Sequence, residues 1–309
     1  MVALAFAVVC SVAIGVIFKH AGRRELDRTA LLTINYASAV GVAGLVLTLG
    51  GREVQAGLAL SGGLVALGIG TGVLLIAGFF ALAWATEAAG MSLAIGVMRV
   101  SVVVPFLASW LVWGEVPSLA QGLGMVLAMG AFFLLAHRRS TPARVPAHAS
   151  GSAGGLPELQ EGSASVDWYA TGVLALTFCL GGGVDVSMKA FQEGFGANNS
   201  RVLFLLLAFG VAFLVGAAIV LWRGVVRDHW PTGRAIGWGL LLGVVNYGSL
   251  EFLLRAIEAL PGPFVFPANN ISIMSLAALL GVTVWGEHLS RPNRIGLGLA
   301  TLALLLLGL

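Results

Sequence analysis

Charged side chains are scarce in this sequence. Lys, Arg, Asp and Glu make up 10% of the 309 residues, against 58% hydrophobic residues and a mean hydropathy of +0.96. A soluble domain carries roughly 25% charged residues. The shortage therefore excludes an ordinary water-soluble globular protein.

Cysteines and catalytic motifs are scarce as well. The two cysteines, Cys10 and Cys179, fall inside apolar runs without the spacing of a metal site or a redox pair. No phosphate-loop or nucleophile motif appears, and GIGTG at 68–72 follows no strand, which favours helix packing over a dinucleotide site. The five histidines share no helix spacing. We therefore expect no enzyme activity, no cofactor and no metal site.

Long apolar runs fill nearly all of the chain outside one central stretch. Each run approaches the roughly 20 residues that cross a bilayer as a helix, and the alternation of a barrel strand is absent. A backbone in lipid must find its hydrogen bonds within its own segment, so the runs are predicted to be helices. The predicted fold is all-α and integral to the membrane, with ten spans: 2–18, 29–49, 58–84, 91–113, 118–136, 168–190, 202–222, 234–255, 264–285 and 293–309.

A polar stretch divides the chain into two units of similar length. Residues 137–167 are rich in Ser, Gly, Ala and Pro and have no apolar period, a composition typical of a flexible linker. The predicted units are five helices in 1–136 and five helices in 168–309.

The two units resemble each other in sequence. A shift of 172 residues places the WGE motif at 113–115 on the WGE motif at 285–287, and a shift of 170 places Lys19 on Lys189. The first shift aligns three further pairs: Ser118 with Ser290, Gly90 with Gly262, and Gly124 with Gly296. Because each unit has an odd number of spans, the second crosses the membrane in the opposite sense, which predicts two inverted repeats.

The repeated pattern of an apolar span ending in WGE, a Ser, a short polar link and a Gly-rich span resembles the repeat of EamA-type drug/metabolite transporters. It stands at 113–136 and again at 285–309. Pro105 fits the family's proline in the fourth span, whereas Pro267 lies ten residues nearer the start of the ninth span once the shift is applied. The resemblance implies a secondary transporter.

Inverted repeats are the architecture of alternating access, in which a site near the membrane midplane opens to each side in turn. The mixed charges in the spans favour a small polar or zwitterionic metabolite as substrate over a purely lipophilic drug. A membrane scaffold without transport, or an interfacial membrane enzyme, is the alternative. The predicted partners are the substrate, a coupling proton as one candidate, and the lipid bilayer, with no nucleic acid, for a monomer or a homodimer.

Basic residues gather in the odd-numbered links, which hold twelve of them from Lys19 to Arg294, while the even-numbered links hold Arg52, Arg201 and Arg255. The positive-inside rule then places the odd links in the cytoplasm and both termini outside. The predicted location is a cell membrane, crossed many times, which is the inner membrane in a Gram-negative bacterium.

Asp185 and Lys189 form the best charged pair within a span. They lie one helical turn apart in the sixth span, where an ion pair offsets part of the cost of burial. In one interpretation they line the cavity and bind a charged substrate. In the other, Lys189 reaches toward the headgroups and Asp185 is only its partner.

A polar stripe runs along the eighth span. Tyr247, Glu251 and Arg255 follow at a spacing of four, with Asn246 beside them. A carboxylate one turn before an arginine is a favourable pair, and a desolvated Glu can carry a proton. Glu251 is therefore a candidate for proton coupling, or one half of a structural ion pair.

The ninth span begins PFVFPANNISIMS, which places Asn269 and Asn270 just after Pro267. A proline frees a backbone carbonyl, which is tolerated at membrane depth where other groups or water satisfy it. A broken or kinked helix that faces a cavity is one interpretation, and interhelical hydrogen bonding by the asparagines is the other.

Arg99 lies about two turns into the fourth span, where it can pair with Glu87, bind an anionic substrate group or reach the interface. Glu115 and Glu287 end the two WGE motifs. Their symmetry suggests that each caps the next helix or closes a gate between the units.

Overall fold

A computed structural model describes residues 1–24, 26–51, 57–136, 168–228, 230–286 and 290–309, and within these ranges the chain is helical, without strands. The predicted linker, 137–167, and Glu287 lie outside the described residues. The helices are α1 (Val2–Arg23), α2 (Arg28–Leu49), α4 (Gly62–Ala89), α5 (Met91–Val100), α6 (Val103–Leu111), α7 (Leu119–Ala136), α8 (Trp168–Gly194), α9 (Arg201–Arg227), α10 (Gly233–Ala259), α11 (Gly262–Trp285) and α12 (Arg291–Leu307).

Eight helical segments of the described chain are long and apolar enough to cross a membrane. α5 and α6 count together as one of them, Leu93–Leu111, whereas α7 holds only a shorter apolar helix, Leu119–Leu135. The predicted all-helical, multi-pass membrane class is confirmed. The count of ten spans stays a prediction.

Polar caps set where several helices begin. Asp27 accepts hydrogen bonds from the N–H groups of Thr29 and Ala30 at the start of α2, and Ser61 and Thr232 cap α4 and α10 in the same way. Such side chains satisfy backbone donors that a helix leaves free in its first turn. α4 thus begins at Gly62, after the start predicted from its apolar run, whereas α2 and α10 begin within one residue of theirs.

The fourth predicted span is broken, and the ninth is not. α5 and α6 are separated at residues 101–102, because Pro105 has no N–H to give to the carbonyl of Ser101. That carbonyl accepts from the N–H of Val104 instead, at 2.9 Å. α11 runs unbroken through Pro267, so the predicted break in the ninth span is wrong, whereas a kink there stays a prediction. Pro267 is the sixth residue of α11, so the N–H that it lacks would bond only to the carbonyl of Pro263 in the first turn.

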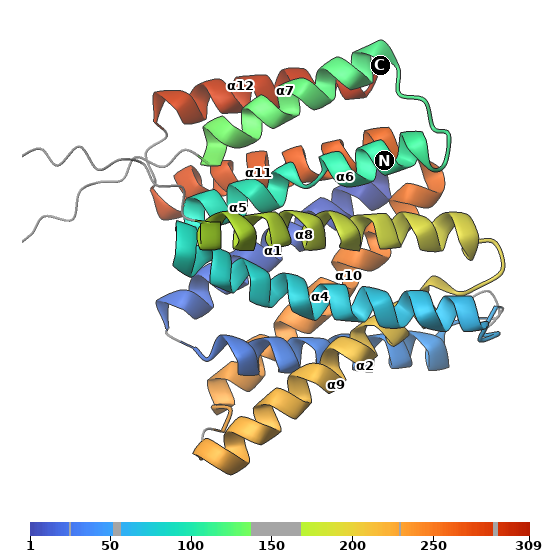
Figure 1. Ribbon diagram of the computed structural model, residues 1–309, viewed down its shortest axis with the longest axis vertical. Coiled ribbons are helices and arrows are strands. Elements are labelled where there is room, and N and C mark those ends of the chain that lie inside the picture. Colours follow the sequence, from blue (N-terminus) through green and yellow to red (C-terminus); the bar gives the residue numbers. More distant parts are fainter. Residues whose placement is uncertain (25, 52–56, 137–167, 229, 287–289) are drawn as a thin grey trace, which may run out of the picture.

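The helices form one bundle, and most of them run between its left and right ends in Figure 1. α7 and α12 pack side by side along one edge, while α2, α9 and α10 pack together toward the opposite edge. Between these edges, α4 packs on α8 and α9, and α1 packs on α10 and α11. Both termini lie at the same end of the bundle (Figure 1).

Glycines allow the closest of these contacts. A Cβ atom built on Gly68 of α4 would lie 2.7 Å from Cβ of Leu207 on α9, and one built on Gly239 of α10 would lie 2.7 Å from Cβ of Ile34 on α2. Small residues let membrane helices approach this closely. The interpretation of 68–72 as a packing motif is confirmed.

Candidate functional site

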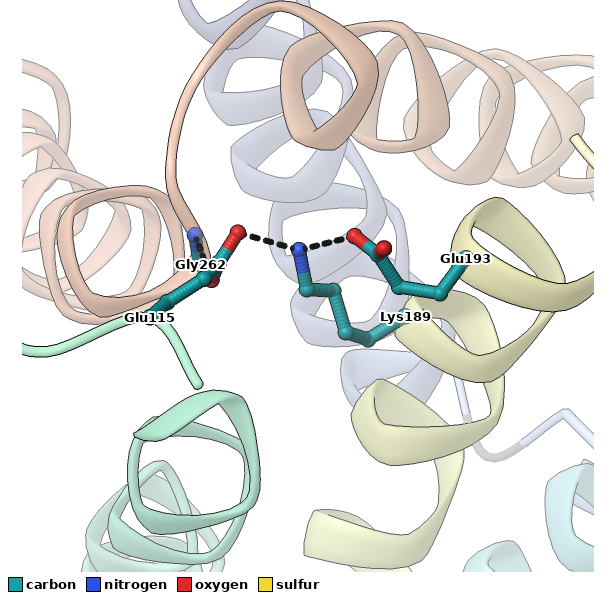
Figure 2. A network of polar contacts seen from close by, with 4 residues as sticks. All are labelled: Glu115, Lys189, Glu193 and Gly262. Carbon is teal, nitrogen blue, oxygen red and sulfur yellow. Dashed lines mark hydrogen bonds and ion pairs between the residues drawn. The ribbon is translucent and has the colours of Figure 1, made fainter. Parts of the chain in front are cut away.

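Lys189, on α8, is the least exposed charged residue that the structure describes, with 1% of its surface accessible. Its Nζ donates to Oε1 of Glu115 and to Oε1 of Glu193, each at 2.6 Å (Figure 2). Glu193 lies one turn further along α8, and Glu115 lies in the link between α6 and α7. A buried ammonium is costly unless it is paired and hydrogen-bonded, and these two carboxylates meet that need.

Glu115 joins three elements. Its Oε2 accepts from the backbone N–H of Gly262, the first residue of α11, at 2.9 Å (Figure 2). A carboxylate at a helix start satisfies a free donor and complements the helix dipole. We call Lys189, Glu115, Glu193 and the N–H of Gly262 the Lys189 cluster, which ties α8 to the α6–α7 link and to α11. Glu115 thus caps a helix, as predicted, but this helix is α11 of the other unit and not α7, the next helix along the chain.

A cavity of about 330 Å³ opens beside the Lys189 cluster. Its walls come from the last turns of α8 and α10 and from the link that enters α11. Lys189, Glu115 and Glu193 line it together with Gln192, Ile257, Glu258, Ala259, Leu260 and Pro261. Carboxylates and one ammonium thus dominate its polar lining, so a polar ligand or water is its natural occupant.

The predicted ion pair of Asp185 and Lys189 is not formed in this structure. The side chain of Lys189 extends toward the end of the bundle, where two carboxylates hold it. Asp185 is half-buried and makes no hydrogen bond or ion pair within the described part of the chain. It interacts electrostatically with Arg99 of α5.

Arg99 reaches from the break in the fourth span to α11. Its Nη1 donates to Oδ1 of Asn270 at 3.0 Å, and Nδ2 of Asn270 donates to the carbonyl of Phe266 at 3.1 Å. Glu87, the partner considered from the sequence, is exposed near the end of α4. The guanidinium of Arg99 thus bonds to an amide and interacts electrostatically with Asp185, a carboxylate that has no other partner among the described residues.

Glu251 lies between two arginines. The predicted pair with Arg255 is confirmed, with Nε donating to Oε1 at 2.8 Å. Arg201, at the start of α9, lies 3.7 Å from the same oxygen and also pairs with Glu258. Because Glu258 lines the cavity beside the Lys189 cluster, this chain of charges connects the polar stripe of α10 to that cavity.

The remaining predicted residues of α10 and α11 have fewer polar contacts. The hydroxyl of Tyr247 and Oδ1 of Asn269 are buried without a hydrogen-bond partner among the described residues. Asn246 is half-buried and hydrogen-bonds to no described residue. Tyr247 and Glu251 also line a second, mainly apolar cavity of about 430 Å³ between α1, α2 and α10. The described chain holds no cluster of three His, Cys, Asp or Glu side chains that could bind a metal ion.

At the opposite end of the bundle, α1 contacts the end of α11. The ammonium of Lys19 lies 3.9 Å from the ring centre of Trp285, within the range of a cation–π interaction. At the same end, Asp27, which caps α2, pairs with Arg223 of α9 at 3.1 Å. Burial raises the pKa of Asp27, but hydrogen bonds and the charge of Arg223 outweigh it, so the pKa lies below its ordinary value.

Comparisons with known proteins support the fold and leave the activity open. No family model matches the chain. It is 26% identical over 299 residues to an uncharacterized protein of Haemophilus influenzae, covering 95% of this chain and 93% of that protein. A crystal structure aligns with 99% of this chain and 94% of its own, with a TM-score of 0.73 and 15% identity. The helical arrangement is therefore shared with a solved protein.

Sequence reasoning did not consider Glu193 and Glu258, and it gave Arg201 and Glu115 other roles. Arg201 was counted only as a charge in a link, although a cation at the start of α9 could have been matched to Glu251. Glu115 was expected to cap the next helix or to close a gate, and its bond to Lys189 was not predicted. The sequence repeat indicated this contact. Lys19, which aligns with Lys189, lies against Trp285, and Lys189 bonds to Glu115 in the link that follows Trp113.

Proposed function

We propose that this chain is a secondary transporter of the drug/metabolite transporter type, which moves a small polar or zwitterionic metabolite across a cell membrane by alternating access. The observation that carries the proposal is the reciprocal packing of the two halves around charged groups within the spans. Ten spans in two inverted five-helix repeats are part of the proposal.

Reciprocal helix contacts support the inverted duplication. α1 packs on α10 and α11, and the corresponding helix of the other half, α8, packs on α4 and on α5 and α6. Likewise α2 packs on α10, and α9 packs on α4. α1 and α8 run in opposite directions (Figure 1). Helices that correspond in the two halves thus make corresponding contacts with the other half. A two-fold axis in the membrane plane produces this arrangement.

Individual residues follow the same reciprocity. Gly72 of α4 and Gly243 of α10 stand 171 positions apart, and each lies against the backbone of a helix from the other half. Arg99 of the first half bonds to Asn270 of the second. The two glycines thus make equivalent contacts in the two halves, while Arg99 and Asn270 join the halves directly.

α7 and α12 complete the proposed ten spans. With 18 and 17 residues, they extend roughly 26 Å at 1.5 Å per residue, close to the roughly 30 Å of the hydrocarbon core. Gly124 of α7 packs against Leu307 of α12, and Gly296 of α12 packs against Leu134 of α7. Each of the two helices thus packs a leucine against a glycine of the other.

Opposite charges inside the spans support a polar substrate. Arg99 and Asp185 lie in the fourth and sixth predicted spans, next to the break between α5 and α6. Charges at this depth are expensive and usually line a pathway, and broken helices mark binding sites in many transporters. A ligand with an ammonium and a carboxylate would match the two charges.

Uptake into liposomes tests the proposal. The protein is reconstituted and offered a mixed metabolite pool, and accumulated compounds are identified by mass spectrometry. We expect selective uptake of a polar or zwitterionic compound. We also expect Asp185→Asn to raise its half-saturating concentration roughly tenfold or more, because a charge-assisted contact is lost.

Glu87→Gln is the matched control, because it removes an exposed carboxylate at the end of α4 and should leave uptake unchanged. A scaffold without transport would accumulate nothing from the pool. Equal uptake by wild type and Asp185→Asn would remove Asp185 from the site.

A further inference from the structure

Lys189 has carboxylates on both sides along α8. In this structure its ammonium is held by Glu115 and Glu193, toward the end of the bundle. Asp185 lies one helical turn in the other direction and has no ion pair among the described residues. A Lys side chain with four methylenes and three donors can reach a partner one turn away on its own helix.

Asp185 is on the face of α8 that meets the broken span. A Cβ atom on Gly182, less than one turn before Asp185, would lie 2.6 Å from Cβ of Val104 on α6. Lys189, one turn after Asp185, bonds to Glu115 just beyond the end of α6. Asp185 therefore lies between the α6 contact and the Lys189 cluster, inward of the 330 Å³ cavity.

The two carboxylates of the cluster differ in what they join. Glu193 is on α8 itself and moves with Lys189, so its ion pair places no restraint between helices. Glu115 also accepts from the first N–H of α11, so its bond to Lys189 ties α8 to α11 and to the α6–α7 link. Release of Lys189 from Glu115 would remove this tie and leave the ammonium with Glu193 alone. Asp185, one turn away, is then the carboxylate that can replace Glu115.

We propose that Lys189 exchanges partners during transport, leaving Glu115 for Asp185, and that this exchange opens the end of the bundle beside the 330 Å³ cavity. The inference rests on the proposed alternating access and assigns Lys189 a positioning role in it. The i, i+4 pair of Asp185 and Lys189 then belongs to the open state, and the Lys189 cluster belongs to the closed state.

The substitution Ser109→Cys reports the opening. The Ser109 hydroxyl is buried without a partner among the described residues, directly against Gly262, so the introduced thiol replaces no hydrogen bond and stays hidden while the cluster is closed. The two natural cysteines, Cys10 and Cys179, are free and are replaced by alanine. The rate of modification by a water-soluble thiol reagent is then measured in liposomes without substrate, so the readout does not depend on any transport activity.

Glu115→Gln and Glu193→Gln form a matched pair, because each removes one carboxylate at 2.6 Å from Lys189. In the Ser109→Cys background, we expect Glu115→Gln to raise the labelling rate of the introduced thiol about tenfold, as expected for loss of one charged hydrogen bond. Glu193→Gln should change that rate little. Equal effects of the two variants would overturn the proposal.

The role of Asp185 is tested by combining variants. If Lys189 moves to Asp185, Asp185→Asn should abolish most of the acceleration caused by Glu115→Gln. Undiminished acceleration when both substitutions are present would show that Asp185 is not the second partner, and would overturn the exchange.

Asp185→Asn without Glu115→Gln leaves the cluster intact and so should fold as wild type does, with slower labelling of the introduced thiol. Faster labelling would contradict the proposal. Failure of liposome uptake with these labelling results intact would instead count against the proposed function.

Discussion

Single residues of this protein are constrained most tightly where helices begin against other helices. Gly262 starts α11 directly against Ser109 and Glu115, whereas Gly233 starts α10 with open space around it. The two glycines hold the same position in their helices, so a methyl group added to each isolates the effect of packing.

We expect Gly262→Ala to destabilise the protein by about 1–3 kcal/mol, because overpacking forces neighbouring groups apart. Gly233→Ala should change stability by less than about 0.5 kcal/mol. Thermal unfolding in detergent, followed by circular dichroism, measures both. A midpoint for Gly262→Ala that equals the midpoint for Gly233→Ala would show that the tight contact carries no stability.

A second residue, Asp27, predicts a pH dependence. Its pKa lies below the ordinary value because Arg223 and two backbone N–H groups outweigh the effect of burial. A lowered pKa means that the ionised form stabilises the folded state above the unfolded pKa of about 3.9, and that this contribution is lost as pH falls through the folded value.

Asp27→Asn keeps a capping side chain but removes the charge. We expect its unfolding midpoint to lie below that of wild type at neutral pH, by an amount that stays constant down to about pH 5 and shrinks in more acidic buffer. Unfolding midpoints across a pH series give this difference directly. A difference that grew as pH fell would have the wrong sign for a lowered pKa.

At the scale of an element, the break between α5 and α6 is the feature that positions charge. Arg99 lies two residues before the break, and Gly182 of α8 packs against Val104 just after it. Pro105 causes the break, because it cannot donate to the carbonyl of Ser101. The direction in which Arg99 leaves its helix therefore depends on this proline.

We expect Pro105→Ala to let the fourth span close into one helix, which preserves or raises thermal stability but lowers liposome uptake several-fold by moving Arg99. Pro267→Ala is the control, since α11 is already continuous. Uptake and unfolding midpoints of both variants are compared with wild type. Unchanged uptake by Pro105→Ala would mean that the break does not position the site.

At the scale of the whole molecule, the proposed inversion predicts the sidedness of the links. Arg24 follows the first helix of the first half, and Asn198 follows the first helix of the second half, and both are exposed. In a cysteine-free background in intact cells, a reagent that does not cross the membrane should label Asn198→Cys and not Arg24→Cys, since the basic links face the cytoplasm. Labelling of both from one side would rule out an inverted repeat.

Most helices of this protein and one of its ion pairs can be predicted from local sequence. The apolar runs predict the helices within a few residues at most ends, because hydrophobic length and backbone hydrogen bonding are properties of each segment alone. The pair of Glu251 and Arg255 was also predictable, since one helical turn separates them. Arg99, Asp185 and Asn270 were recognised for the same reason, as polar groups in apolar surroundings.

Only the tertiary structure decided which of these groups meet. The sequence offers Lys189 two partners, Asp185 on its own helix and Glu115, which lies 74 positions away along the chain. In this structure Lys189 pairs with Glu115. Arg201 joins Glu251 from another helix, and Arg99 finds Asn270 across the two halves. Periodicity fixes neighbours along one helix, but contacts between helices depend on how the halves pack, and small residues such as Gly182 and Gly262 set that packing.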